Sequence, residues 1–374
     1  MQMRPLARAL VDAGHHICFA VPPSLGGVLA TEGFCSERIV PELDELSDIA
    51  AASRPDWERW TPDRRALFLF AVLWPSLVLA QLKRLIVDWN ADLVIYEEGE
   101  FAGPLAAAKT SRASASLGWP GPARTDANIR AISPVLEDLW SSEGLGHIPV
   151  SHRLYGDCSI RTCPPSLDRE MPPSAILMRA GGGISSCPSN WEHPPYGRRM
   201  AHATLGTVAE YASAANIFDQ IVTGARSADL SLILSVGPEL DPSRWHDPVH
   251  DIYAFNLVPH DEVIPQAMAT ILHGGAGTFW RALSHGCPLL VLPRGGASQF
   301  RNARACVRRG VGLALEPTSV SAESVASSLK LLEQSPHYRH AAHSVACEIE
   351  AMPRAESAVL KLEAIVSERQ STKH

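Results

Sequence analysis

The segment ILHGGAGTFWRALSHGCPLLVLP, residues 271–293, constrains the fold of this chain more than any other. An apolar run there meets a histidine and three glycines within four residues, and a helical stretch follows. We expect a short buried strand at 269–272, because the run is mostly apolar and bounded by breakers. We expect a helix over 278–285 that ends at Gly286 and Pro288. A strand that feeds a helix through so tight a turn is typical of parallel α/β structure.

The turn itself has the composition of an anion site. Gly274, Gly275 and Gly277 let the backbone turn tightly and let a ligand approach it closely. The first turn of the following helix has unpaired N–H groups and a partial positive charge, which favour phosphate. His273 and Thr278 add side-chain donors. A ligand-free connection can use the same glycines, so this turn alone does not decide between the two interpretations.

Other turns in the second half favour the binding site. Three breaker loops follow predicted strands, at 206–207, 259–260 and 273–277, and a polar pair at 298–299 follows a fourth strand. In open parallel sheets, ligands bind outside the carboxyl ends of the strands, near the point where the strand order reverses. The strands predicted in this half are 200–205, 230–236, 252–258, 269–272, 289–292 and 311–315.

The first half alternates strands and helices in the same way, which indicates a second parallel α/β domain. Its predicted strands are 16–21, 92–96 and 113–117, and its predicted helices are 4–13, 24–31, 64–89 with a break at Pro75, and 103–109. Breakers concentrate between the halves. We therefore predict an N-terminal domain (1–180), a linker (181–197), a C-terminal domain (198–353) and a final helix (354–374) that packs back on the first domain.

Composition narrows the class of protein. The net charge of −7 argues against a nucleic-acid partner. Eight cysteines without a CxxC pair are typical of reduced thiols in a cytoplasmic protein. No secretory leader is visible, and no apolar run reaches the roughly 18 residues that span a bilayer. The longest run, 66–82, contains Pro75, so we predict a buried helix there.

Several motifs resemble one known family. VPH (258–260), HGGAGT (273–278), ALSHGCPLLVLP (282–293) and SQFRNA (298–303) resemble the donor-binding half of GT-B (twin-Rossmann) glycosyltransferases. The likeness is to the nucleotide-sugar-dependent natural-product type, within the UDP-glycosyltransferase-like superfamily. The resemblance extends over nearly the whole chain, because it also includes the segments 5–23, 90–108, 203–207 and 338–353. The resemblance implies two Rossmann-like domains that face each other across a cleft.

The resemblance also implies roles in the donor site. His273 would contact the α-phosphate, residues 275–278 would present N–H groups to the diphosphate, and Thr207 would make a second phosphate contact. Backbone groups near Val258 would meet a pyrimidine base, and Gln299 would hydrogen-bond the sugar. Ser298 stands where the family usually has an acidic residue, which fits a deoxygenated sugar. The implied donor-binding set is Gly206, Thr207, Val258, Pro259, His273, Gly274, Gly275, Gly277, Thr278, Ser298 and Gln299.

The chain departs from the family at its N-terminus. The resemblance implies a first strand that ends in a loop with a histidine that deprotonates the acceptor, and this sequence starts inside that motif, without the strand and the histidine. We therefore expect the first strand of the N-terminal domain to be missing, which would leave a gap in its sheet. Glu97 is the catalytic candidate that remains. Trp57, Phe101 and Trp119 are candidates for an apolar acceptor site, although aromatic residues at such positions are also common in cores.

The predicted function is that of an inverting glycosyltransferase in the cytoplasm. It would move a deoxysugar or other sugar from a dTDP- or UDP-sugar to a hydroxyl of an apolar natural product such as a polyketide antibiotic. We expect no metal site, no cofactor, no nucleic-acid partner and no membrane span, and a homodimer stays open. The alternative is a non-catalytic relative that binds nucleotide-sugars or stabilises a partner. An NAD-dependent enzyme is disfavoured, because no GxGxxG follows an N-terminal strand.

Overall fold

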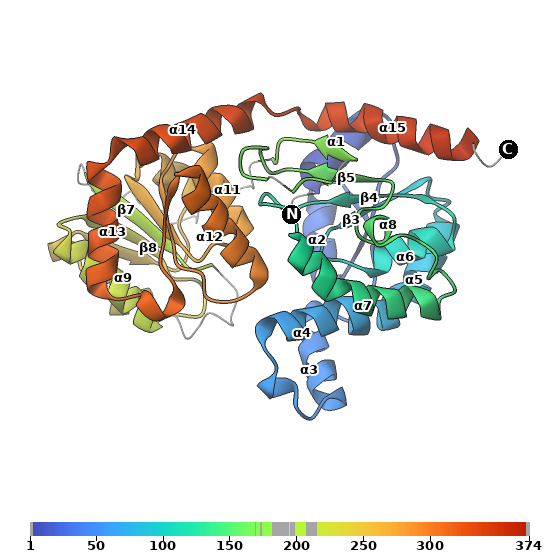
Figure 1. The fold of residues 1–374 in the computed structure, drawn as a ribbon, viewed down its shortest axis with the longest axis horizontal. Helices are drawn as coiled ribbons and strands as arrows, with labels where there is room; N and C mark the ends of the chain where they lie inside the picture. Colours follow the sequence, from blue (N-terminus) through green and yellow to red (C-terminus); the bar gives the residue numbers. More distant parts are fainter. Residues whose placement is uncertain are drawn as a thin grey trace.

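Two α/β lobes lie side by side in the computed structural model, and the C-terminal helices run along one edge of both (Figure 1). The structure describes residues 3–168, 170–172, 174–181, 194, 199–206 and 215–371. Almost all of the predicted linker, 181–197, and Thr207 lie outside these residues. The predicted class, two parallel α/β domains, is confirmed.

The C-terminal lobe is built on one parallel sheet of six strands in the order β12-β11-β10-β7-β8-β9. The order reverses between β7 and β10, so the switch point lies between these two central strands. Apolar cores cover both faces of the sheet. The elements are β7 (Met200–Thr204), α9 (Ala215–Ser227), β8 (Ser231–Ser235), β9 (Ile252–Phe255), α10 (His260–Val263), β10 (Ala269–Leu272), α11 (Ala276–Ser284), β11 (Leu289–Val291), α12 (Ala297–Arg309), β12 (Gly312–Ala314), α13 (Ala322–Gln334) and α14 (Pro336–Ala351).

Local sequence accounts for the boundaries that matter most. The strand predicted at 269–272 is confirmed residue for residue as β10, and all four residues are buried. Helix α11 begins at Ala276, two residues before the predicted start, because Gly275 takes the extended conformation of an N-cap. Gly310 ends α12 with a left-handed φ of 70°, which a side chain would disfavour.

The N-terminal lobe contains a larger share of helix. Its elements are α1 (Arg4–Asp12), β1 (Cys18–Val21), α2 (Pro23–Thr31), β2 (Cys35–Arg38), α3 (Leu43–Ser53), α4 (Pro62–Phe68), α5 (Trp74–Asp88), β3 (Leu93–Glu97), α6 (Ala102–Lys109), β4 (Ala113–Leu117), α7 (Asp126–Ser142), α8 (Val150–Tyr155), β5 (Cys158–Arg161) and β6 (Ala175–Leu177). Helices α3 and α4 project from this lobe in Figure 1.

The strands of the N-terminal lobe form two separate parallel sheets. Among the described residues, β1 pairs only with β2, and β3 begins a second sheet in the order β3-β4-β5-β6. Strand β4 is buried throughout, whereas the first three residues of β3 are only half-buried. The described strands therefore have the break between β1 and β3 that the predicted absence of a central strand implies.

The prediction of a buried helix at 66–82 is correct for only one of its faces. Residues Asp63–Asp88 form a 26-residue helical run that is long and apolar enough to cross a membrane, and 28% of its most apolar window is buried. Trp74, Val78 and Leu82 pack into the core of the lobe, while Phe70 and Val72 are exposed. A π-helical turn at Leu69–Leu73 precedes Pro75 and accommodates the break that proline was expected to cause.

The last helix, α15 (Ala355–Ser371), belongs to the core of the N-terminal lobe. Its apolar residues share a cluster with Leu6 and Leu10 of α1 and with strands β4, β5 and β6. Helix α14 leads to it from the C-terminal lobe (Figure 1). The chain therefore crosses between the lobes a second time.

Candidate active site

The glycine-rich turn lies at the switch point of the C-terminal sheet. Leu272 at the end of β10 pairs in register with Thr204 at the end of β7, so His273 and Gly206 leave the sheet side by side. The next residues open α11, with Gly275 as its N-cap. The histidine, the two strand ends and the first turn of α11 thus converge where open α/β sheets bind ligands.

Two glycines make room for the His273 ring. A Cβ on Gly206 would lie 2.8 Å from Cε1 of His273, and a Cβ on Gly275 would lie 2.4 Å from its Nε2. Gly206 also has a φ of 88°, a conformation that other residues rarely adopt. The glycines at these positions therefore fix where the imidazole sits.

The electrostatics of His273 suit a neutral donor close to a cation. Burial, and then the charge of Arg294, lower the pKa of His273 to about 4. The imidazole is therefore neutral at pH 7. Arg294 brings a permanent positive charge to the same place. It was not predicted, because it follows β11 without any motif of its own. A neutral donor, an arginine and a helix N-terminus together favour an anionic ligand.

Helix α12 braces this turn from the other side. Asn302 donates from Nδ2 to the carbonyl oxygen of Gly274, at 2.7 Å. Oε1 of Gln299 accepts from the backbone N–H groups of Arg294 and Gly295, at 2.9 and 3.2 Å. Gln299 thus holds the loop before α12 through its carbonyl oxygen, and its contact with a sugar stays a prediction. Ser298 beside it is half-buried.

The predicted base-binding segment adjoins a buried histidine pair. Val258 and Pro259 are buried, and the next residue, His260, lies 3.0 Å from His202 of β7, measured from Nδ1 to Nε2. Nδ1 of His202 must donate to the carbonyl oxygen of Ile233, since a carbonyl only accepts. A neutral His202 then accepts at Nε2, and His260 donates to it. Burial lowers the pKa of His202 to about 4. Burial, together with the charges of His202 and Arg281, lowers the pKa of His260 to about 3.

In the N-terminal lobe, Glu97 ends β3 and is exposed. Partial desolvation by the surrounding protein raises the pKa of its carboxyl, although a hydrogen bond with Trp119 lowers it. Trp119 is itself half-buried. The other two aromatic candidates lie in cores: Phe101 packs in the core of the lobe, and Trp57 is buried in an aromatic cluster with Trp60 and Phe68. Of the three aromatic acceptor candidates, Trp119 is the one that hydrogen-bonds to Glu97.

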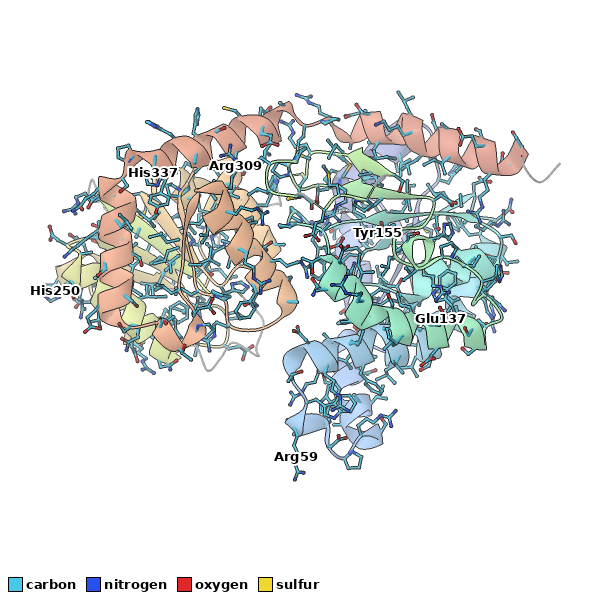
Figure 2. The ribbon with its side chains drawn as sticks, viewed as in Figure 1. Arg59, Glu137, Tyr155, His250, Arg309 and His337 are labelled. Carbon is cyan, nitrogen blue, oxygen red and sulfur yellow. The ribbon has the colours of Figure 1, made fainter. Side chains whose placement is uncertain are left out.

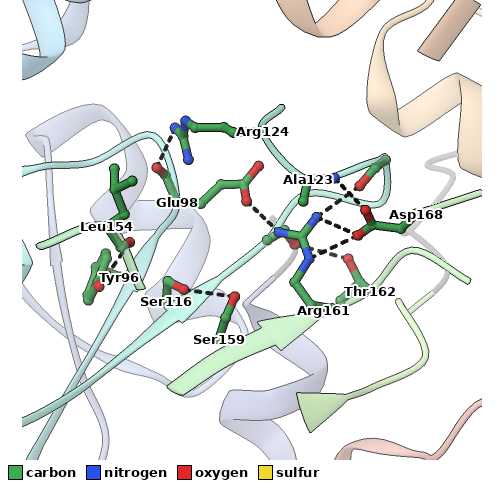
Figure 3. Close-up of polar contacts among 12 residues, drawn as sticks. Tyr96, Glu98, Ser116, Ala123, Arg124, Leu154, Ser159, Arg161, Thr162 and Asp168 are labelled. Atoms are coloured by element: carbon green, nitrogen blue, oxygen red, sulfur yellow. Dashed lines mark hydrogen bonds and ion pairs between the residues drawn. The ribbon is translucent and has the colours of Figure 1, made fainter. Parts of the chain in front are cut away.

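The carboxylate next to Glu97 has a structural role that the sequence did not reveal. Glu98 forms a buried ion pair with Arg161, 2.5 Å from Oε2 to Nη1, and Asp168 pairs with the same guanidinium at 3.1 Å (Figure 3). Burial alone would raise the pKa of Glu98, but the charges of Arg161 and Arg124 lower it further than burial raises it. Glu98 is therefore ionised. The ion pairs among Glu98, Arg161 and Asp168 connect β5 to the loops that follow β3 and β4.

The C-terminal part of the chain matches a family described as "Erythromycin biosynthesis protein CIII-like, C-terminal domain", over residues 228–365. Curated relatives align over nearly the whole chain. The 10-deoxymethynolide desosaminyltransferase of Streptomyces venezuelae is 24% identical, over 97% of this chain and 93% of the relative. The erythronolide mycarosyltransferase of Saccharopolyspora erythraea is 26% identical, over 96% of this chain and 94% of the relative.

Solved structures have the same fold. Glycosyltransferase VinC in complex with dTDP has a TM-score of 0.78 at 21% identity, over 98% of this chain and 96% of that one. The calicheamicin glycosyltransferase CalG4 has a TM-score of 0.78 at 19% identity, over 98% and 94%. These likenesses define a twin-Rossmann fold, with the glycine-rich turn at the switch point of its C-terminal sheet. The chain therefore has the GT-B fold, and it is similar over nearly its whole length to glycosyltransferases of antibiotic biosynthesis.

Proposed function

We propose that this protein transfers a sugar from a dTDP- or UDP-sugar to a hydroxyl of an apolar natural product, with inversion at the anomeric carbon. The observation that carries the proposal is the position of His273 between Gly206 and Gly275, at the start of α11 and beside Arg294. The named relatives transfer deoxysugars or aminodeoxysugars such as desosamine and mycarose. One solved neighbour is bound to dTDP and another to the spinosyn aglycone.

In the proposed reaction, the acceptor oxygen attacks the anomeric carbon while the bond to the diphosphate breaks. The diphosphate leaves with the electron pair, and its charge develops against the N–H groups of α11, the imidazole of His273 and the guanidinium of Arg294. These groups are fixed before the reaction, so they need little reorganisation as the charge forms. Our proposal assigns this stabilisation to protein groups and uses neither a metal nor a cofactor.

Glu97 is our candidate for the group that takes the acceptor proton. Its carboxylate is accessible at the carboxyl end of β3, and its raised pKa makes it a better base than an ordinary surface glutamate. Trp119, its hydrogen-bond partner, orients it and offers an apolar surface for the acceptor. We place the enzyme in the cytoplasm, where the free cysteines found among the described residues would stay reduced.

Calorimetric titration with dTDP and UDP tests the donor site. His273→Ala removes a donor to a charged phosphate oxygen, so we expect affinity to fall by about 1–3 kcal/mol, or roughly 5- to 150-fold. His250→Ala is the matched control. His250 is exposed and pairs with Asp247 at the far side of the C-terminal lobe (Figure 2).

The control variant should bind both nucleotides like the unaltered protein. Equal affinities for the His273→Ala variant and the unaltered protein would show that the phosphates bind elsewhere. Product formation is then measured by mass spectrometry, with dTDP- and UDP-sugars and a panel of macrolide and anthracycline aglycones. A protein that binds nucleotide and forms no product with any of them would support the non-catalytic alternative.

A further inference from the structure

Helix α12 contacts both lobes. Three of its residues bond to the N-terminal lobe: the N–H of Ala297 donates to Oδ1 of Asp63 at 3.0 Å, Arg301 to Oδ1 of Asn128 at 3.4 Å, and Arg308 to a backbone carbonyl at 2.8 Å. Positions 297, 301 and 308 fall within about 40° of one another at 100° per residue. They form one face of the helix.

The opposite face of α12 serves the anion site. Gln299 and Asn302 are buried, and they hold the loop at Arg294 and the carbonyl of Gly274. Asn302 also lies against Gly121 of the N-terminal lobe, where an added Cβ would come within 2.6 Å of its Oδ1. Positions 299 and 302 lie roughly 100–200° around the helix from the first face. A shift of α12 relative to the N-terminal lobe therefore acts on the glycine turn through Asn302.

The contact at Asp63 lies at the start of this helix. Asp63 lies in the projecting helix α4, 234 residues before Ala297, and it caps a free N–H in the first turn of α12. Its charge also reaches Arg301. Burial and the charges of Arg124 and Arg161 lower the pKa of that guanidinium, whereas the carboxylates of Glu98 and Asp63 act to raise it. Two carboxylates of the N-terminal lobe thus flank a cation of α12.

We propose that Asp63 is a positioning residue for the donor site: it anchors the first turn of α12 to the N-terminal lobe, and α12 in turn holds the glycine turn at residues 274–277. The inference rests on the proposed function for the identity of the ligand, a nucleoside diphosphate. The anchoring itself is a property of the unliganded chain. The N-terminal lobe, whose predicted role is to bind the acceptor, thereby completes the geometry at the donor.

Hydrogen exchange on the unliganded protein tests the anchoring, with three variants. Asp63→Ala removes the cap, whereas Asp63→Asn keeps an oxygen that accepts the Ala297 N–H. Asp48→Ala is the matched control, because Asp48 is an exposed carboxylate of the same projecting region in α3. We expect Asp63→Ala to speed exchange about fivefold at residues 297–299 and about threefold at 274–277, consistent with the usual cost of losing a cap. Asp63→Asn should restore most of the protection.

Titration with dTDP adds a readout that a local cap alone would not change. We expect Asp63→Ala to bind dTDP about three- to tenfold more weakly, with an unfolding temperature within a few degrees of the original and near-normal binding in Asp63→Asn. Faster exchange confined to 297–299, or unchanged exchange throughout, would overturn the inference. If the unaltered protein bound no nucleotide, the proposed function would fail, and exchange at 274–277 would still decide this inference.

Discussion

Replacing Gly275 by alanine should disable the anion site without disturbing the fold. Gly275 has a φ of −63°, which alanine adopts without strain. The added Cβ would lie 2.4 Å from Nε2 and 2.7 Å from Cε1 of His273, about 1 Å inside a normal contact. The backbone keeps its place, so the imidazole has to rotate away.

The size of the effect follows from what the imidazole contributes. A hydrogen bond to a charged phosphate oxygen is worth about 1–3 kcal/mol, so we expect dTDP affinity to fall roughly 5- to 150-fold. If both substitutions act through the same ring, Gly275→Ala combined with His273→Ala should lose no more than His273→Ala alone. Such non-additivity is the signature of two residues that share one interaction.

Gly27→Ala is the matched control for this prediction. It makes the same change in helix α2 of the N-terminal lobe, outside the predicted donor site, where a Cβ would meet nothing within 4 Å. We expect unchanged affinity and a gain in stability of up to about 1 kcal/mol, because alanine is the better helix former. Calorimetric titration of the three variants and the double variant completes the test. Full dTDP affinity in Gly275→Ala would refute the role given to the His273 ring.

Two further predictions concern catalysis and stability. Glu97→Gln should reduce product formation by about 10²- to 10⁴-fold and leave dTDP affinity unchanged, as measured by mass spectrometry and titration; near-normal turnover would assign the proton to another group. The His202–His260 pair should make stability fall as the solution is acidified. Their folded pKa values, about 4 and about 3, lie below the ordinary value near 6.5, so the unfolded chain takes up protons first. As the pH falls from 6.5 to 4, protonation of His202 alone should lower the free energy of unfolding by about 3 kcal/mol. A urea midpoint that stayed constant from pH 7 to pH 4.5 would contradict the buried histidine pair.

Local sequence was sufficient for the centre of the C-terminal lobe. Strand β10 is apolar throughout, and the glycines after it permit only a tight turn, so the position of His273 at the switch point followed from pattern and fold rules. The same reasoning did not predict α7, because its residues 126–142 mix polar and apolar side chains around an internal Pro134. A local capping box between Thr125 and Asn128 and the packing of its apolar side stabilise that helix.

Contacts between segments that are far apart in the chain could not be predicted from the sequence. Asp63 and Ala297 are 234 residues apart, and nothing in either segment indicates the other. Likewise, Glu98 resembled its acidic neighbours in the sequence, and only the fold shows that it faces Arg161 while Glu97 faces solvent. A pattern can place a residue at a strand end, but the side of the strand and the partner depend on which loops meet there.

Because α15 completes the core of the N-terminal lobe, that lobe cannot be finished until the end of the chain has been synthesised. The ribosome releases the N-terminal half first, and the remaining roughly 190 residues take about 10–40 s at usual rates of synthesis. Throughout that interval, the apolar side of α1, with Leu6 and Leu10, lacks the residues of α15 that cover it in the finished molecule. The first lobe to emerge is thus the last to be completed. The apolar surface of α1 therefore gains its cover from α15 only after synthesis has reached the end of the chain.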